Sequence, residues 1–247
     1  MITTMSKIES VLLNAYAHRL RYGFSTKPHF VAGVEADTSV LDEHRQAWLK
    51  RFAMNTDKLA FPIQVHGNEY FAVSQAQHGE VDAILVDQPH SPAVVFSADC
   101  TPVILYAPDI HQGAVVHCGW KSTALGLAPK MVNVLREAGA DVSKMIVVIA
   151  PALSLDGFEI DADVLAQLQA SIPWEAQGLW YRKAFNHSSK FHADVPFVNE
   201  LQLRHAGVRC LERLAMATDT HPDLLWSFRS GDWQRQGTFL ELCYSRV

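Results

Sequence analysis

The middle third of this chain carries short apolar runs that are separated by glycine and proline residues. Two of these runs, at 93–96 and 103–106, read Ala-Val-Val-Phe and Val-Ile-Leu-Tyr without a polar interruption. Continuous apolar runs are typical of strands covered on both faces, whereas a half-exposed strand alternates apolar and polar side chains. The pattern therefore predicts a buried sheet, with strands at about 70–74, 81–86, 93–97, 103–106, 114–116 and 145–149.

Helical spacing of apolar side chains flanks this region. It predicts helices over 41–52, 123–137, 163–170 and 197–205, with Gly139 and Gly207 ending the second and the fourth, and a strand at 208–211. The segment from 173 to 196 is rich in Trp, His and Ser and is predicted to be a long irregular loop. No repeat or linker divides the chain. We therefore expect one α+β domain over residues 1–247.

Composition excludes several classes of function. The 247 residues are 49% hydrophobic, enough for one substantial core, and a net charge of -5 without a basic run gives no electrostatic reason to bind nucleic acid. No stretch approaches the ~18–20 apolar residues of a membrane span, and charged residues interrupt the first twenty positions. The four cysteines form no C-x-x-C pair, which favours reduced thiols. These features predict a soluble cytoplasmic protein without membrane contact.

Three metal-capable side chains follow apolar runs at expected strand ends: His66, Cys100 and His117. Glycine or Thr-Pro follows each within two residues, so the backbone can turn sharply just past the side chain. Two imidazoles and one thiolate around a tetrahedral zinc ion would leave one free position, which is typical of catalytic rather than structural sites. The sequence therefore predicts an enzyme with these three residues as metal ligands and catalytic residues.

Two neighbours of these residues need separate roles. Adjacent side chains on a strand point to opposite faces, so we assign His117 to the site and Cys118 away from it. Asp99 precedes Cys100 and either orients a ligand or anchors the loop through a hydrogen bond, or simply caps a turn.

The chain resembles the YfiH-like family, whose members have been called laccase-domain proteins, multicopper polyphenol oxidases and purine nucleoside phosphorylases. The resemblance extends from Gly23-Phe24-Ser25-Thr26 to the last strand and implies a fold of two layered sheets between helices (α/β/β/α). The motifs that carry it are Gln64-Val65-His66-Gly67, Val81-Asp82-Ala83, Ala98-Asp99-Cys100-Thr101-Pro102-Val103, His117-Cys118-Gly119-Trp120-Lys121, Trp226-Ser227-Phe228-Arg229 and Arg235-Gln236-Gly237.

The resemblance implies zinc, with copper as an alternative ion, on His66, Cys100 and His117. It also implies phosphorolysis of adenosine, inosine, guanosine and methylthioadenosine, together with deamination of adenosine. The chain departs from the family pattern at Cys118, at Lys121-Ser122 and at Ala150-Pro151, and it lacks a Cys-Thr pair near 218–220. These departures leave anion binding and the exact substrate open.

Purine nucleosides and phosphate are therefore the expected partners. Arginine's planar fork suits phosphate better than a point charge does. The candidate substrate-binding residues are Arg229, Arg235 and Lys121, with Arg45 from the amino-terminal helix, although each could equally form a surface ion pair. Three aromatic side chains could stack on a purine or belong to the core: Trp120, Trp226 and Phe228.

Other uses of the same residues remain open. Cys100 as a nucleophile, with His66 or His117 as its base, would make a cysteine hydrolase or amidase, for example one acting on peptidoglycan precursors. A copper polyphenol oxidase is a weaker alternative, because the chain lacks repeated His-x-His pairs for several copper ions. A purely structural metal would require a fourth protein ligand, such as Cys118 or a histidine from the segment 173–196.

Overall fold

The computed structural model describes residues 7–27, 56–76, 78–173, 178–185, 187 and 189–243. Its largest sheet has six strands in the order β12-β8-β6-β7-β4-β3. The outer pairs β12–β8 and β3–β4 are parallel, and the other pairs are antiparallel. The strands are β3 (Tyr70–Ala72), β4 (Ala83–Val86), β6 (Thr101–Ala107), β7 (Gln112–Cys118), β8 (Ile146–Ile149) and β12 (Cys210–Arg213).

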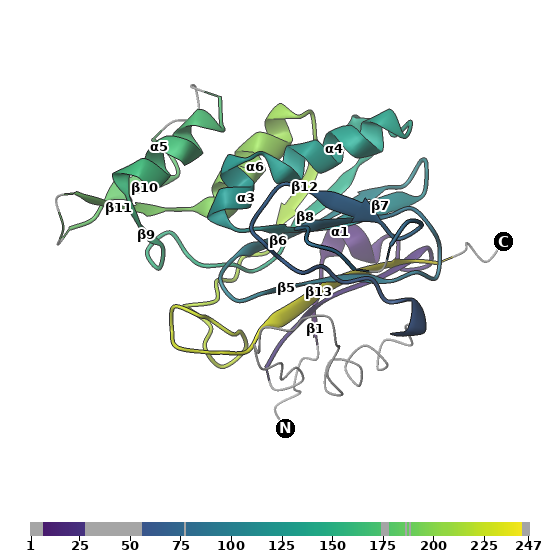
Figure 1. Ribbon diagram of the computed structural model, residues 1–247, viewed down its shortest axis with the longest axis horizontal. Coiled ribbons are helices and arrows are strands. Elements are labelled where there is room, and N and C mark those ends of the chain that lie inside the picture. The colour runs from purple at the N-terminus through teal and green to yellow at the C-terminus, as the bar shows by residue number, and fades with distance from the viewer. Residues whose placement is uncertain are drawn as a thin grey trace.

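A second sheet has the order β1-β2-β13-β5 and is antiparallel throughout. It consists of β1 (Lys7–Ile8), β2 (Leu20–Ser25), β5 (Ala93–Ser97) and β13 (Gln236–Leu242). Residues of the two sheets, among them Phe24, Ile84, Ile104 and Leu240, share one apolar cluster with Leu13 of α1 (Val11–Asn14). The two sheets therefore pack face to face (Figure 1).

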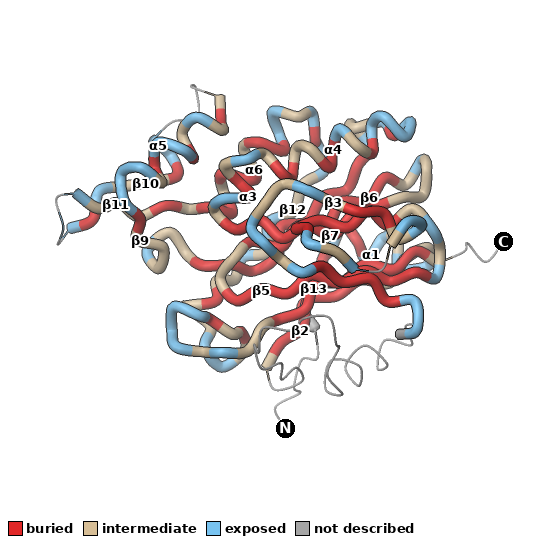
Figure 2. The backbone as a smooth tube through the Cα atoms, viewed as in Figure 1, coloured by how far each residue is buried: buried red, intermediate tan, exposed pale blue. Residues whose placement is uncertain are grey.

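Helices cover the other face of the six-stranded sheet (Figure 1). They are α3 (Trp120–Ala124), α4 (Leu127–Glu137) and α6 (Val195–His205). Met131 and Leu135 of α4 pack in one cluster with Val103 and Val116 of the sheet. Strands β6 and β8 are consequently buried along their whole length, as Figure 2 shows in red for β6. This confirms the predicted strands with both faces covered and the mixed α and β class with layered sheets.

A small third sheet lies beside α5 (Ala162–Ala170). It joins β9 (Glu159–Asp161), β10 (Tyr181–Lys183) and β11 (Lys190–Ala193). The expected irregular loop at 173–196 is therefore wrong, since this segment holds a strand pair and the start of α6. The strands are short and carry few apolar residues, so the sequence pattern is weak. Their packing depends on Trp180, which is fully buried against α5.

Local backbone conformation explains the other differences from the expected elements. The predicted helix at 123–137 is interrupted at Gly126, whose φ of 71° separates α3 from α4. Gly139 and Gly207 follow their helices with positive φ, as expected of C-terminal caps. The helix expected at 41–52 lies outside the described residues. Two short 3-10 helices span Thr56–Lys58 and Val142–Lys144. No described helix combines the length and apolarity required to cross a bilayer.

Candidate active site

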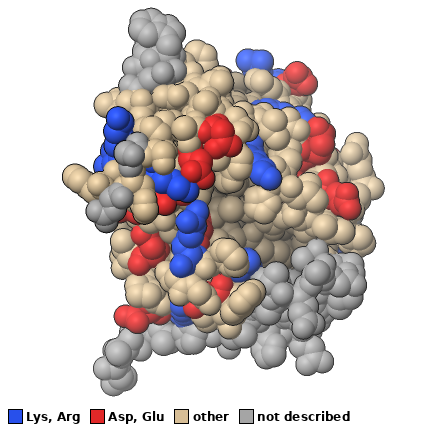
Figure 3. All heavy atoms as spheres, turned by 60° about the vertical axis from the view of Figure 1, so that its left-hand side comes forward, with Lys and Arg blue, Asp and Glu red and all other residues tan. Residues whose placement is uncertain are grey.

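A cavity of about 610 Å³ opens where the chain passes from β5 in one sheet to β6 in the other. Its lining residues fall within 62–66, 96–101, 117–120, 153–158, 195–196 and 228–235. On this side of the molecule, basic side chains border a hollow and acidic side chains lie near by (Figure 3). The size is that of pockets which bind small molecules.

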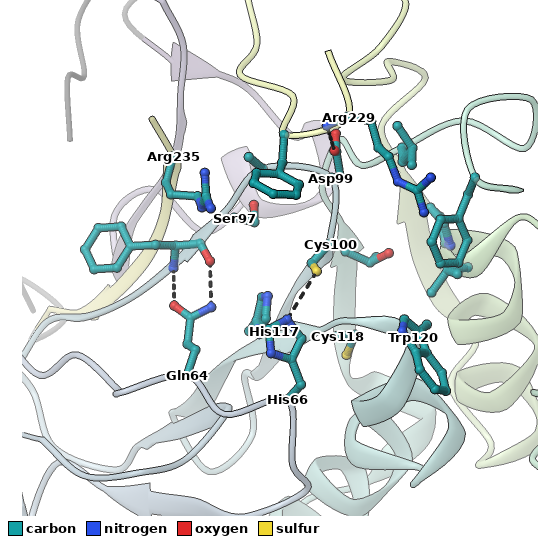
Figure 4. Close-up of a pocket in the computed structure, with 18 of the residues that line it drawn as sticks. Gln64, His66, Ser97, Asp99, Cys100, His117, Cys118, Trp120, Arg229 and Arg235 are labelled. Atoms are coloured by element: carbon teal, nitrogen blue, oxygen red, sulfur yellow. Dashed lines mark hydrogen bonds between the residues drawn. The ribbon is translucent and has the colours of Figure 1, made fainter. Parts of the chain in front are cut away.

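The three predicted donors converge on the wall of this cavity (Figure 4). His66 lies in the loop before β3, Cys100 directly precedes β6, and His117 is next to last in β7. Their nitrogen and sulfur donor atoms all lie within 4.8 Å of one another, and Cys100 Sγ is 3.8 Å from His66 Nε2. Tetrahedral zinc with usual bond lengths would place such a sulfur and nitrogen about 3.6 Å apart. The donor set therefore fits a zinc ion.

Asp82, which directly precedes β4, positions both histidines through hydrogen bonds. Its Oδ1 lies 2.8 Å from His117 Nδ1, while its Oδ2 accepts backbone hydrogen bonds from Gly67 (2.6 Å) and Val65 (3.2 Å) on either side of His66. The carboxylate is fully buried. A proton on Nδ1 that faces the carboxylate leaves His117 Nε2 free as a donor. One side chain thus sets the position of two donors from separate elements.

The charges of this cluster shift three pKa values. Burial alone would raise the pKa of Cys100, but charges and hydrogen bonds from His117 and His66 outweigh it and lower the pKa to about 6. Burial lowers the pKa of His117, yet Cys100 and Asp82 raise it to about 9. Burial also opposes ionisation of Asp82, but His117 holds its pKa below the usual value. Metal-free protein therefore favours a thiolate and an imidazolium, and a thiolate is the form that binds metal.

Two loops at the site adopt a backbone conformation that disfavours side chains. His66 and Asp99 have φ values of 58° and 88°, which cost on the order of 1–3 kcal/mol each. Hydrogen bonds hold Asp99 in place, since its carboxylate accepts from Thr218 Oγ1 (2.6 Å) and from the backbone of Arg229 (2.8 Å). Of the roles considered for Asp99, the structure shows loop anchoring.

Close packing at Gly119 was not predicted from the sequence. A Cβ there would lie 2.6 Å from His66 Cδ2 and 3.3 Å from Cys100 Sγ, so only glycine leaves room for the two donors. The neighbouring Cys118 belongs to the apolar cluster under α4, and burial raises its pKa strongly. His117 and Cys118 thus point to opposite faces of β7, as expected, although Cys118 also contributes to the cavity lining.

Two of the four predicted substrate-binding residues line the cavity. Arg229 and Arg235 line the cavity, and their guanidinium carbons lie 5.3 Å and 5.5 Å from the ring centroids of Phe158 and Phe228, respectively. Lys121 is exposed and is not part of the lining. Arg45 lies outside the described residues. Of the three aromatic candidates, Trp120 and Phe228 line the cavity, whereas Trp226 packs under the Lys27 ammonium at 4.1 Å.

Comparison with known proteins identifies the family of the chain. The profile of the multi-copper polyphenol oxidoreductase laccase family matches residues 22–246. The chain belongs to this family. The matched span includes all three donors and Asp82. Among the described residues, His66, Cys100 and His117 form the single group of side chains that could hold a metal ion.

Relatives of this laccase-type chain carry a different functional name. A purine nucleoside phosphorylase of Synechocystis sp. is 26% identical over 192 residues, covering 67% of this chain and 72% of that protein. A purine nucleoside phosphorylase of Rickettsia conorii is 29% identical over 164 residues, covering 64% of this chain and 65% of that protein. The crystal structure of the hypothetical protein YfiH from Bacillus licheniformis superposes with a TM-score of 0.80 at 22% identity, covering 93% and 94% of the two chains, and thus has the same fold.

Proposed function

We propose that this protein is a zinc-dependent purine nucleoside phosphorylase acting on adenosine, inosine, guanosine and methylthioadenosine. The observation that carries the proposal is the open three-donor group of His66, Cys100 and His117 on the wall of a cavity of small-molecule size. The names of the relatives supply the reaction. In it, a phosphate oxygen bonds to the anomeric carbon of the sugar and the bond from that carbon to the purine nitrogen breaks. The base departs with the bonding electron pair and takes up a proton, and the sugar 1-phosphate forms.

His66, Cys100 and His117 would hold the ion, which supplies Lewis-acid polarisation when bound. Other side chains of the protein orient the ligands and bind the substrate. Asp82 keeps the His117 ring oriented through Nδ1. Aromatic side chains in the lining offer faces on which a purine can stack: Phe96, Trp120, Phe158 and Phe228. Deamination of adenosine is proposed for the same site as a separate reaction: water adds to the purine carbon that carries the amino group, the bond from that carbon to the amino nitrogen breaks, and ammonia and inosine are released.

The test uses purified protein whose metal content is measured by elemental analysis. Incubation with adenosine and phosphate should release adenine and ribose 1-phosphate. Cys100→Ala should abolish the release while circular dichroism shows a folded protein, and Cys118→Ala, which changes a cysteine outside the donor group, should keep it. Zinc-loaded protein that releases no base from any of the four nucleosides would refute the proposal.

A second candidate function, a cysteine hydrolase acting on amides such as peptidoglycan precursors, is supported by one specific observation. Asp82, His117 and Cys100 follow one another as a carboxylate, an imidazole and a thiol, the order found in nucleophilic triads. A thiol hydrolase would survive a zinc chelator and lose activity on alkylation. Loss of activity on chelation, with recovery after zinc is returned, would exclude it.

A further inference from the structure

Ser97 ends β5 with a hydroxyl that has no hydrogen-bond partner among the described residues. The residue is only 2% exposed and lines the cavity. A buried hydroxyl left unpaired costs about 1–3 kcal/mol, so such groups in a cavity wall often serve a ligand. Thr101 Oγ1, on another lining residue, is unpaired as well. Ser97 is the one that the strand register places beside an arginine.

Arg235 lies next to Ser97 in the adjoining strand region. β13 pairs with β5 so that Gln236 stands opposite Ser97, and Arg235 immediately precedes Gln236. Figure 4 shows Arg235 and Ser97 together on the cavity wall opposite His66, with Cys100 beyond Ser97. The β13 register therefore brings a cation and an unpaired hydroxyl to one place.

Backbone hydrogen bonds hold the Arg235 guanidinium, and no described carboxylate lies within ion-pair distance of it. Nη1 donates to the backbone oxygens of Trp233 (3.1 Å) and Gln234 (3.0 Å), and the guanidinium carbon lies 5.5 Å from the Phe228 ring centroid. Within the described part of the chain, no carboxylate forms an ion pair with Arg235, and Nε and Nη2 make no hydrogen bond. Burial lowers the pKa of Arg235, and the more distant charges of Cys100 and Asp99 oppose this shift without outweighing it. An arginine in this position favours an anion.

We propose that Arg235 and Ser97 form an oxyanion subsite that binds phosphate beside the His66, Cys100 and His117 group. This rests on the proposed phosphorylase function and assigns its co-substrate to one side of the cavity. The guanidinium edge donates through Nε and Nη2, and the Ser97 hydroxyl donates a further hydrogen bond to the same anion. Arg229 lies at the exposed rim over Phe158 and contacts the organic substrate instead.

The experiment measures binding of inorganic phosphate to the zinc-loaded protein by isothermal titration calorimetry, and KM for phosphate and for adenosine separately. Ser97→Ala should weaken phosphate binding about tenfold, and Arg235→Ala about 100-fold. Arg235→Lys should recover only part of this loss, because it keeps the charge and loses the fork. Arg229→Ala should raise KM for adenosine and change phosphate affinity less than twofold. Arg136→Ala, an exposed arginine on α4, is the control for net charge.

The results separate the subsite from the proposed function. Phosphate binding that falls as stated, in a protein that cleaves no nucleoside, would keep the subsite and reject the phosphorylase. Nucleoside cleavage with an unchanged KM for phosphate in Ser97→Ala and Arg235→Ala would reject the subsite. Wild-type protein that binds no phosphate, or an Arg229→Ala variant that loses as much phosphate affinity as Arg235→Ala, would also overturn it. Ser97→Ala removes one oxygen atom and keeps the test valid if Arg235→Ala does not fold.

Discussion

Gly119→Ala tests whether the donor group binds metal in the geometry seen here. The backbone at Gly119 (φ -67°, ψ 170°) accepts alanine, so any effect must come from the added methyl group. That carbon would lie 2.6 Å from His66 Cδ2, whereas carbon atoms normally stay about 3.5 Å or more apart. The imidazole must withdraw by about 0.9 Å, while metal–ligand distances tolerate only about 0.2 Å.

Overpacking of this kind costs about 1–3 kcal/mol, and the cost falls on the metal-bound form because the His66 ring can move aside when no ion holds it. Zinc affinity should therefore fall about 5- to 150-fold. The melting temperature of metal-free protein should fall little, since Gly→Ala also restricts the unfolded chain. Competition with a chromogenic zinc chelator measures the affinity, and thermal unfolding with and without zinc measures the stability.

Gly67→Ala is the matched control, because its Cβ would meet Val65 Cγ2 at 3.6 Å and Asp82 Oδ2 at 3.7 Å, which are ordinary contacts. It should change zinc affinity less than twofold. The reasoning fails if Gly119→Ala binds zinc as tightly as the wild type, or if it destabilises the metal-free and zinc-loaded proteins equally.

Three further predictions concern the same site. Asp82→Asn should weaken zinc binding about 10- to 100-fold, because the carboxylate that orients His117 is lost; an unchanged affinity would contradict this. In metal-free protein, alkylation of Cys100 by iodoacetamide should reach half its maximal rate near pH 6, where the thiol ionises, and zinc should block it; mass spectrometry locates the adduct, and a midpoint near pH 9 would refute the paired thiolate. Cys118→Ala should leave zinc affinity unchanged in the chelator assay, since its side chain lies in the apolar core; a loss equal to that of Cys100→Ala would make it a fourth ligand.

The parts of the fold that the sequence predicts are those whose burial is uniform. Residues 93–97 and 103–106 are covered on both faces, so their apolar runs identify the strands. The break at Gly126 is different, because the apolar spacing continues across this residue and its positive φ, which separates α3 from α4, appears only in the structure. The strands at 181–183 and 190–193 depend on contacts with α5, which no local pattern records.

The donor residues could be predicted because each ends an apolar run, whereas the residues that position them could not. Asp82 acquires its role from strand pairing: Ala83 of β4 stands opposite Val116 of β7, so Asp82, the residue before β4, comes beside His117. The carboxylate could have been identified once that antiparallel register was known. Gly119 and Ser97 depend in the same way on distances between elements.

The connection between the two sheets explains why the site lies where it does. β5 belongs to the four-stranded sheet and β6 to the six-stranded sheet, and only three residues, 98–100, connect β5 to β6. A crossing this short requires a sharp turn, which the positive φ of Asp99 provides. Cys100 therefore lies at the start of β6, next to the end of β7 that carries His117. Ser97 remains on the four-stranded sheet, near Arg235. The turn that joins β5 to β6 therefore places Cys100 of the proposed metal site and Ser97 of the proposed anion subsite on different sheets but beside one another at the same cavity.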